Sequence, residues 1–107
     1  MNEISISEIQ IIPVKPKDGL VAFASCVINN QFYLGNIAIY SSPSASEGFR
    51  LVYPIKILHN GTSLSIVYPI NKETGAIIQR RLVEEYLELV ENLAKGDIPN
   101  EQKQSGA

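Results

Sequence analysis

The sequence predicts an α+β fold in which an antiparallel four- to five-stranded sheet is followed by one long C-terminal helix. Apolar residues alternate with polar residues in several short runs between residues 4 and 69, as in half-buried strands. Clusters of turn-forming residues separate these runs. Beyond residue 71 the apolar spacing changes to three and four residues, which is typical of an amphipathic helix.

The first three strands are expected to form an antiparallel meander. Isoleucines alternate with polar residues in 4–14, and β-rich runs follow at 20–29 and 32–40. Turn chemistry separates the runs, since KPKDG contains Asp-Gly and NNQ is short enough only for a tight hairpin. Residues 41–48, SSPSASEG, contain no core-forming residue and are predicted to be a flexible loop.

Two nearly identical pentapeptides, VYPIK at 52–56 and VYPIN at 67–71, lie in the last two predicted strands, 49–57 and 64–69. Proline cannot donate a hydrogen bond to a strand ladder, so each copy is expected to end a strand. The copies are too close together for a tandem fold repeat. They predict two neighbouring strands that stop at comparable points, the second leading into the helix.

The predicted helix begins at Asn71 or Thr74, either of which can cap it, and ends at Gly96. About 20 residues give a rod of about 30 Å, enough to cross one face of a small sheet. Residues 1–96 are therefore expected to form the domain, and 97–107 a flexible tail.

Composition indicates a single soluble domain. The chain has 107 residues, of which 45% are hydrophobic and 19% charged. No apolar run is long enough to span a membrane and the N-terminus lacks the features of a signal peptide, so the expected compartment is the cytoplasm. The one cysteine, Cys26, lies in an apolar run and is expected to be a buried thiol.

No pattern of catalytic or metal-binding residues is present. His59 is the one histidine and has no cysteine or second histidine near it in the sequence. No nucleophile motif and no glycine-rich phosphate loop occurs. We therefore expect no catalytic residues, no metal and no cofactor, and the chain is not predicted to be an enzyme.

The motifs and their order resemble the SpoVG family of bacterial septation and sporulation regulators. After the strand-rich first half, the family has a four-residue pattern: an aromatic residue or Met, then Pro, then any residue, then Lys. Tyr53–Lys56 match this pattern. The His-Pro-Ile-Asn motif before its helix is matched by Tyr68–Asn71. The helix pattern is matched by the following residues: Ile78, Gln79, Leu82, Val83, Glu85 and Tyr86. The resemblance covers residues 4–94.

This resemblance implies a cytoplasmic, non-enzymatic homodimer that binds DNA, and also RNA, and regulates gene expression. An unpaired strand edge is a natural place for a two-fold contact. The family is also expected to direct basic residues at the helix start toward nucleic acid. In this chain Gly75, Ala76 and Ile77 stand where an Arg-Gly-Lys segment is expected.

Five cations are the candidate nucleic-acid contacts. Nine Lys and Arg against eleven Asp and Glu give a net charge of −2, so any binding must come from a local patch. Lys72, Arg80 and Arg81 lie at the helix start, where a partial positive charge and free amides favour phosphate. Arg50 and Lys56 are expected on one face of a single strand. The five candidates are Lys72, Arg80, Arg81, Arg50 and Lys56.

An alternative interpretation accounts for each of these cations. Arg80–Glu84 and Arg81–Glu85 have the four-residue spacing of ordinary exposed ion pairs on a helix. The strand cations, Arg50 and Lys56, are equally compatible with the solvated side of a half-buried sheet. Most of the five tyrosines are likewise expected in the core or at a dimer interface. The corresponding alternative function is a dimeric protein-interaction or structural module that has lost nucleic-acid binding.

Overall fold

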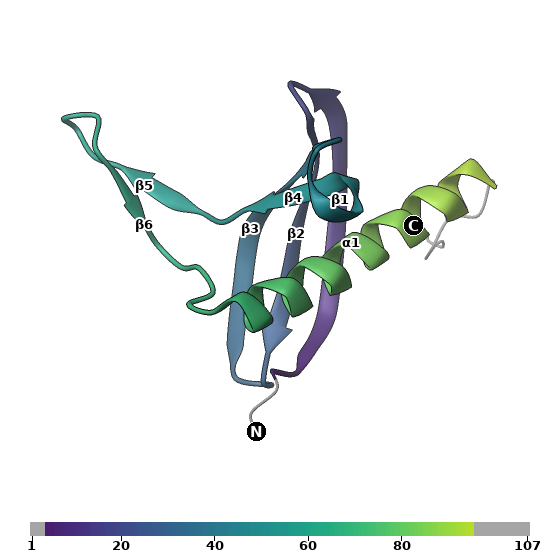
Figure 1. Ribbon diagram of the computed structural model, residues 1–107, viewed down its shortest axis with the longest axis horizontal. Helices are drawn as coiled ribbons and strands as arrows, with labels where there is room; N and C mark the ends of the chain where they lie inside the picture. The colour runs from purple at the N-terminus through teal and green to yellow at the C-terminus, as the bar shows by residue number, and fades with distance from the viewer. Residues whose placement is uncertain (1–3, 96–107) are drawn as a thin grey trace, which may run out of the picture.

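The computed structural model describes residues 4–95, which form a four-stranded antiparallel sheet, a separate two-stranded sheet and one long helix (Figure 1). The elements are β1 (Ile6–Lys17), β2 (Leu20–Ile28), β3 (Phe32–Ser41), a 3-10 turn (Ser46–Gly48), β4 (Phe49–Val52), β5 (Ile55–Ile57), β6 (Ser63–Ser65) and α1 (Lys72–Ala94). The predicted α+β class and the long C-terminal helix are confirmed. The predicted tail, 97–107, lies outside the described residues. Within the described part of the chain, no helix is long and apolar enough to cross a membrane.

The first four strands are ordered β1-β2-β3-β4, so the predicted meander is confirmed and extended by one strand. Asp18 and Gly19 alone connect β1 to β2, both with positive φ (55° and 90°), as a two-residue hairpin requires. The predicted turn at 15–19 is therefore too long, because β1 continues to Lys17. Asn29 and Asn30 also have positive φ (52° and 56°) in the next hairpin.

An irregularity in β1 shifts the period-two pattern by one residue. Glu8 has a φ of 48°, and the pairing of β1 with β2 shifts between Ser7 and Gln10. Before the shift Ile6 is buried in the core, and after it Ile9 and Ile11 pack against the same core. The β-bulge thus keeps Ile6 on the helix side of the sheet together with Ile9 and Ile11, which follow the shift.

The predicted strand 49–57 is wrong, because it is two strands in two different sheets. β4 ends at Val52 and pairs with β3, whereas β5 begins at Ile55 and pairs with β6. Pro54 lies between them and has no N–H to donate, so the ladder with β3 stops there. The predicted strand 64–69 is also shorter, since β6 ends at Ser65. Residues 55–70, called the arm below, extend away from the main sheet (Figure 1).

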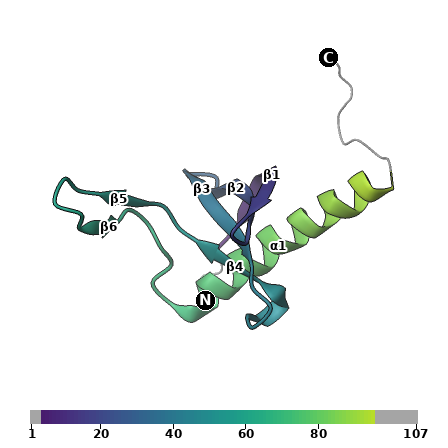
Figure 2. The same cartoon turned by 90° about the horizontal axis from the view of Figure 1, so that it is seen from above.

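Helix α1 begins as predicted at an Asn71 cap, whose Oδ1 accepts a hydrogen bond from the Thr74 N–H at 2.8 Å. Ile78, Leu82 and Val83 are its buried residues. They contribute to a core that also contains Ala22, Ala24, Cys26, Leu34, Ile37 and Ile39. Figure 2 shows the helix on one side of the four-stranded sheet. No helix covers the opposite face within residues 4–95.

Candidate nucleic-acid interface

The helix start presents an exposed cation on a capped first turn. Lys72 is the first residue of α1 and is exposed, and Glu73 follows it. A Cβ at Gly75 would lie 3.4 Å from the Pro69 Cγ, which is van der Waals contact, so the first turn of the helix lies against the incoming chain. The uncharged segment that begins at Gly75 separates Lys72 from the two arginines in the sequence.

Arg80 and Arg81 have different environments although they are adjacent. Arg80 is exposed, on the same side of the helix as Ala76 and Glu84. Arg81 is half-buried, and its Nη1 donates a hydrogen bond to the carbonyl oxygen of Ile6 at 3.2 Å. The structure therefore supports Arg80 as an available cation, whereas Arg81 joins the helix to the start of β1.

The helical ion pairs considered above are not formed. Within residues 4–95 the one ion pair closer than 4 Å joins Lys95 Nζ to Glu91 Oε2 at 3.4 Å. Neither Arg80–Glu84 nor Arg81–Glu85 is within that distance. The exposed guanidinium of Arg80 is thus not held by a carboxylate of its own helix.

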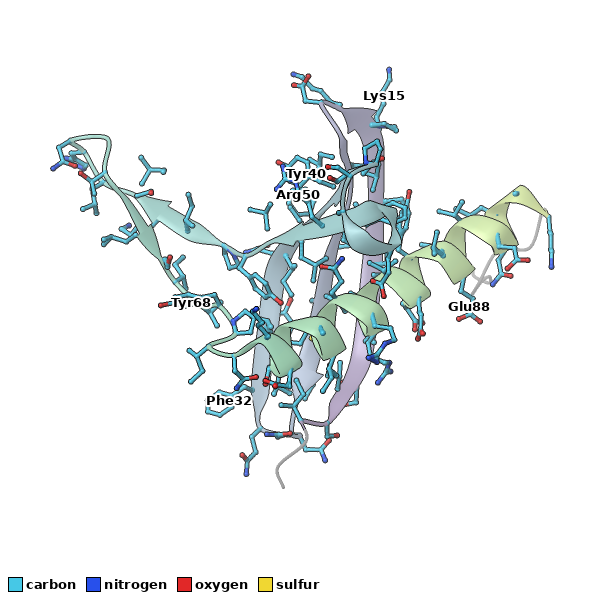
Figure 3. All side chains as sticks on the ribbon, in the orientation of Figure 1. Lys15, Phe32, Tyr40, Arg50, Tyr68 and Glu88 are labelled. Carbon is cyan, nitrogen blue, oxygen red and sulfur yellow. The ribbon has the colours of Figure 1, made fainter. Side chains whose placement is uncertain are left out.

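Arg50 and Lys56 are not brought together as predicted, because they lie in different sheets. Lys56 is exposed on the arm and pairs across it with Leu64. Arg50 lies on β4, and its guanidinium carbon is 4.7 Å from the centroid of the Tyr40 ring on β3 (Figure 3). This is a cation–π contact. The register that creates it, Tyr40 opposite Arg50, could not be read from the sequence.

Arg50 also lines a shallow cleft beside the helix start. The cleft has a volume of about 340 Å³ and is lined by Ala45, Glu47, Phe49, Arg50, Gly75, Ala76 and Gln79. Gln79 spans it by donating from Nε2 to the carbonyl oxygen of Phe49 at 2.7 Å. A cation from β4 therefore lies next to the uncharged part of the helix start, although Glu47 shares the same cleft.

The charges of helix α1 are distributed unevenly along it. Its first ten residues, 72–81, carry three cations and one carboxylate. The remaining residues, 82–94, carry four carboxylates and no Lys or Arg: Glu84, Glu85, Glu88 and Glu91. Any polyanion that contacts this helix is therefore favoured at its N-terminal half and repelled from the rest.

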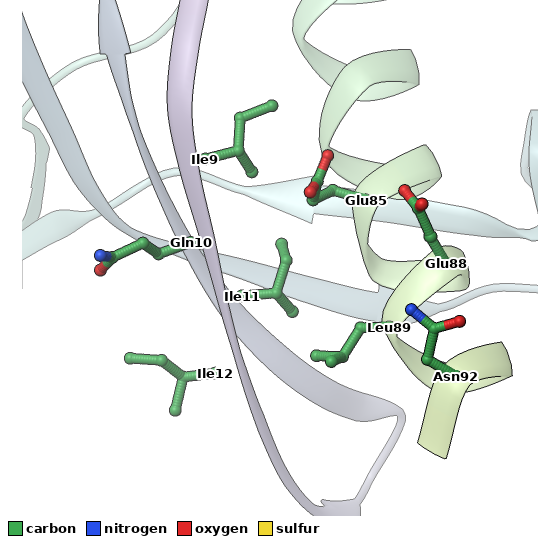
Figure 4. Close-up of a pocket in the computed structure, with 8 residues that line it drawn as sticks. All are labelled: Ile9, Gln10, Ile11, Ile12, Glu85, Glu88, Leu89 and Asn92. Carbon is green, nitrogen blue, oxygen red and sulfur yellow. The ribbon is translucent and has the colours of Figure 1, made fainter. Parts of the chain in front are cut away.

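A second cleft lies between β1 and the acidic half of α1 and has a volume of about 550 Å³. Figure 4 shows Ile9, Ile11 and Leu89 inside it, with Glu85 and Glu88 along the helix. Phosphate groups would be repelled by these carboxylates. This cleft is therefore a poor nucleic-acid site in spite of its size.

Cys26 is fully buried, as the sequence predicted. Burial raises the pKa of its thiol, and the nearby Arg81 charge acts in the opposite direction. Tyr53 is partly buried against the same core, and burial, with a smaller contribution from Cys26, raises its pKa to about 12. Both groups are therefore neutral at physiological pH.

The tyrosines divide between the core and the surface. Tyr53 packs against the core, and the Tyr86 ring meets Phe49 edge-on with centroids 5.5 Å apart. Tyr33 and Tyr68 are exposed instead. The lone His59 is exposed in the arm, and no cluster of three or more metal-ligating side chains occurs in the described part of the chain.

The sequence did not predict that an extensive apolar surface is exposed. It comprises Phe32 and Tyr33 at the start of β3 and the exposed arm residues Ile55, Ile57, Leu64, Ile66, Val67, Tyr68 and Ile70. The sequence places these residues in β-rich runs, which predicts burial for half of them. The arm residues are exposed because the arm leaves the main sheet at Pro54, and Phe32 and Tyr33 lie on the part of β3 that β4 does not pair with.

Comparison with known proteins identifies the family. The SpoVG family model matches residues 4–88. A septation protein SpoVG of Bdellovibrio bacteriovorus is 28% identical over 83 residues, which cover 78% of this chain and 73% of that protein. A septation protein SpoVG of Clostridium perfringens is 28% identical over 90 residues, covering 84% of this chain and 96% of that protein. The chain thus belongs to the SpoVG family.

Proposed function

We propose that this protein is a cytoplasmic homodimeric regulator that binds DNA or RNA and acts in septation and sporulation. The names of its relatives supply septation, and sporulation comes from the family resemblance given above. The observation that carries nucleic-acid binding is the uneven charge of α1, whose N-terminal half presents Lys72 and Arg80 to solvent. The positive end of the helix dipole adds to the attraction for phosphate at Lys72, in the first turn.

The dimer is supported by an unpaired strand edge beside the apolar arm. β4 pairs with residues 38–41 of β3, so residues 32–37 have no partner on that side within the described chain. A groove of about 520 Å³ lies along this edge, lined by Ile28, Phe32, Tyr33, Leu34, Gly35, Asn36, Pro54, Ile66 and Val67. An arm from a second copy would bury this groove and its own exposed apolar residues, and two-fold symmetry would repeat the contact.

A fluorescence-anisotropy titration tests nucleic-acid binding directly, with labelled duplex DNA and RNA at low and moderate salt. Arg80→Ala should weaken binding and lower the salt slope for duplex DNA by about 0.9 for each phosphate that the variant no longer neutralises. Lys95→Ala is the matched control, because it removes an exposed cation from the opposite end of the helix. Equal affinity of Arg80→Ala and wild type would exclude Arg80 as a phosphate contact.

The protein-interaction module is favoured by one specific observation, the exposed apolar surface of the arm and β3. This surface suits a protein partner of a different sequence as well as a second copy. Failure of the wild type to bind any DNA or RNA at low salt would support this second function. The same titration therefore separates the two candidates.

A further inference from the structure

The face of the main sheet opposite the helix carries two complete rows of side chains. Strand pairing aligns Lys17, Leu20, Tyr40 and Arg50 in one row across β1-β2-β3-β4. It aligns Ile12, Phe23, Ala38 and Val52 in the next. Directly paired residues project from the same face of an antiparallel sheet. The two rows are two residues apart on β3 and β4, about 7 Å, and diverge toward β1, where register shifts separate them.

Burial shows which face these rows occupy. Ile39 lies between Ala38 and Tyr40 on β3 and is fully buried in the core beneath the helix. Side chains alternate along a strand, so Ala38 and Tyr40 project from the other face. Figure 2 shows this face free of the helix. On it Ile12 remains 62% exposed and Phe23 37% exposed.

Cations and aromatic rings occur together on this face. Lys17 and Arg50 stand at the two ends of one row, both exposed, and the Arg50 guanidinium lies over the Tyr40 ring. Neither row contains a carboxylate. The nearest acidic residues in sequence, Asp18 and Glu47, lie in the turns that flank the strands.

We propose that this face is a second nucleic-acid surface, one that takes single strands by stacking unpaired bases on Phe23 and Tyr40 while Lys17 and Arg50 contact the phosphates. Every base has an aromatic face, and a base in a duplex cannot offer it to a protein ring, so partly exposed rings on an open sheet select unpaired nucleotides. Because the Arg50 guanidinium lies over the Tyr40 ring, a base stacks there on the other face of the ring or takes the place of the guanidinium as Arg50 turns to a phosphate. Unpaired bases and a phosphate backbone are common to single-stranded DNA and RNA, so this surface recognises either one. This inference rests on the proposed nucleic-acid-binding function but uses the sheet face opposite the helix, which shares Arg50 with the cleft beside the helix start.

The test compares labelled oligothymidylate and oligouridylate with a duplex of the same length. Tyr40→Ala and Phe23→Ala should each weaken single-strand binding about tenfold, because each variant removes one ring on which a base stacks. Tyr40→Phe should retain the wild-type affinity. Arg50→Gln should lower the single-strand salt slope by about 0.7, whereas Tyr40→Ala should leave it unchanged. Leu87→Ala, an exposed apolar residue on the helix side, is the matched control.

A direct spectroscopic readout covers the case in which an alanine variant folds poorly. The chain contains no tryptophan, so Tyr40→Trp introduces a single reporter on the proposed surface. Its fluorescence should be quenched by oligothymidylate or oligouridylate and not by the duplex. Equal responses to both oligomers would show that recognition needs neither the thymine methyl group nor the 2′-hydroxyl, because the two oligomers differ in both groups.

Several results would overturn the proposal. If the wild type binds only duplexes, or if folded Tyr40→Ala binds single strands normally, the sheet face is not the surface, while the proposed function stands. If the Phe23 and Tyr40 variants alter sedimentation instead of binding, this face contacts a second copy of the chain. Absence of all nucleic-acid binding would overturn both this inference and the proposed function.

Discussion

Arg81 and Ile6 are joined by a hydrogen bond although they are 75 residues apart in sequence. The Arg81 Nη1 donates to the Ile6 carbonyl oxygen at 3.2 Å in a partly buried setting. This bond fixes the middle of α1 to the beginning of the sheet. The two neighbouring arginines of the helix therefore have separate roles, one structural and one available to a ligand.

Replacement of Arg81 should thus cost stability, whereas replacement of Arg80 should not. We expect Arg81→Ala to lower the free energy of unfolding by about 1–2 kcal/mol, since the partly buried carbonyl then has no charged donor. Arg80→Ala should change it by less than about 0.5 kcal/mol. Urea unfolding followed by circular dichroism measures both variants. Equal stabilities would show that the Arg81 hydrogen bond contributes nothing measurable.

The helix cap gives a second prediction about stability. Asn71→Ala removes the acceptor for the Thr74 N–H and should cost about 1 kcal/mol. Asn71→Asp retains a capping oxygen and should be close to wild type. Thermal unfolding of the two variants at equal protein concentration makes the comparison. A stable Asn71→Ala protein would mean that the helix start is held by its packing alone.

Tyr53 should make the protein less stable in alkali. Its pKa is raised from 10.0 to about 12, so between these values the unfolded chain loses a proton that the folded chain keeps. The free energy of unfolding should therefore be unaffected by this group below pH 10 and fall as the pH approaches 12. Tyr53→Phe should reduce that slope. Denaturant titrations across this range give the measurement, and an unchanged slope would contradict the assignment.

The thiol of Cys26 should be unreactive in the native protein. The side chain is fully buried and burial raises its pKa, so little thiolate is accessible to a reagent. A disulfide reagent should label it at the rate at which the protein opens, and quickly after addition of denaturant. Rapid labelling of the folded protein would indicate a reactive cysteine instead.

The arm should control association. Ile66 is 61% exposed at the apolar groove beside β3, and Ile66→Glu would place a charge in the proposed contact. We expect the wild type to sediment as a dimer at micromolar concentration and Ile66→Glu as a folded monomer. Leu87→Glu, on the exposed side of α1, is the control and should remain dimeric. A monomeric wild type would contradict the proposed dimer.

The sequence predicted the parts of the fold that depend on local chemistry. Asp18-Gly19 and Asn29-Asn30 set the hairpins, and Asn71 set the helix cap, because each satisfies a backbone requirement within a few residues. The predicted strand 49–57 did not include the interruption at Pro54, which separates β4 from β5. Whether a strand continues beyond a proline depends on the partner available to the next residues, and that partner, β6, is chosen by tertiary structure.

The candidate site was predicted less completely, for the same physical reason. Lys72 and Arg80 are exposed as expected, since their positions follow from the helix period. The engagement of Arg81 with Ile6 and the contact of Arg50 with Tyr40 join distant segments. Such contacts depend on strand register and on where the helix crosses the sheet, which the local pattern of residues does not contain.

The uneven charge of α1 also runs against the dipole of its own backbone. Helices are stabilised by carboxylates near the first turn and cations near the last, yet here Lys72 opens the helix and Glu88 and Glu91 lie toward its end. Glu73 and the Lys95–Glu91 pair offset only part of this. The free helix is therefore electrostatically frustrated, and a bound phosphate near Lys72 would relieve the repulsion at that end. Ligand binding and helix stability are in this way thermodynamically linked, so a polyanion that contacts the helix start should raise the protein's resistance to unfolding.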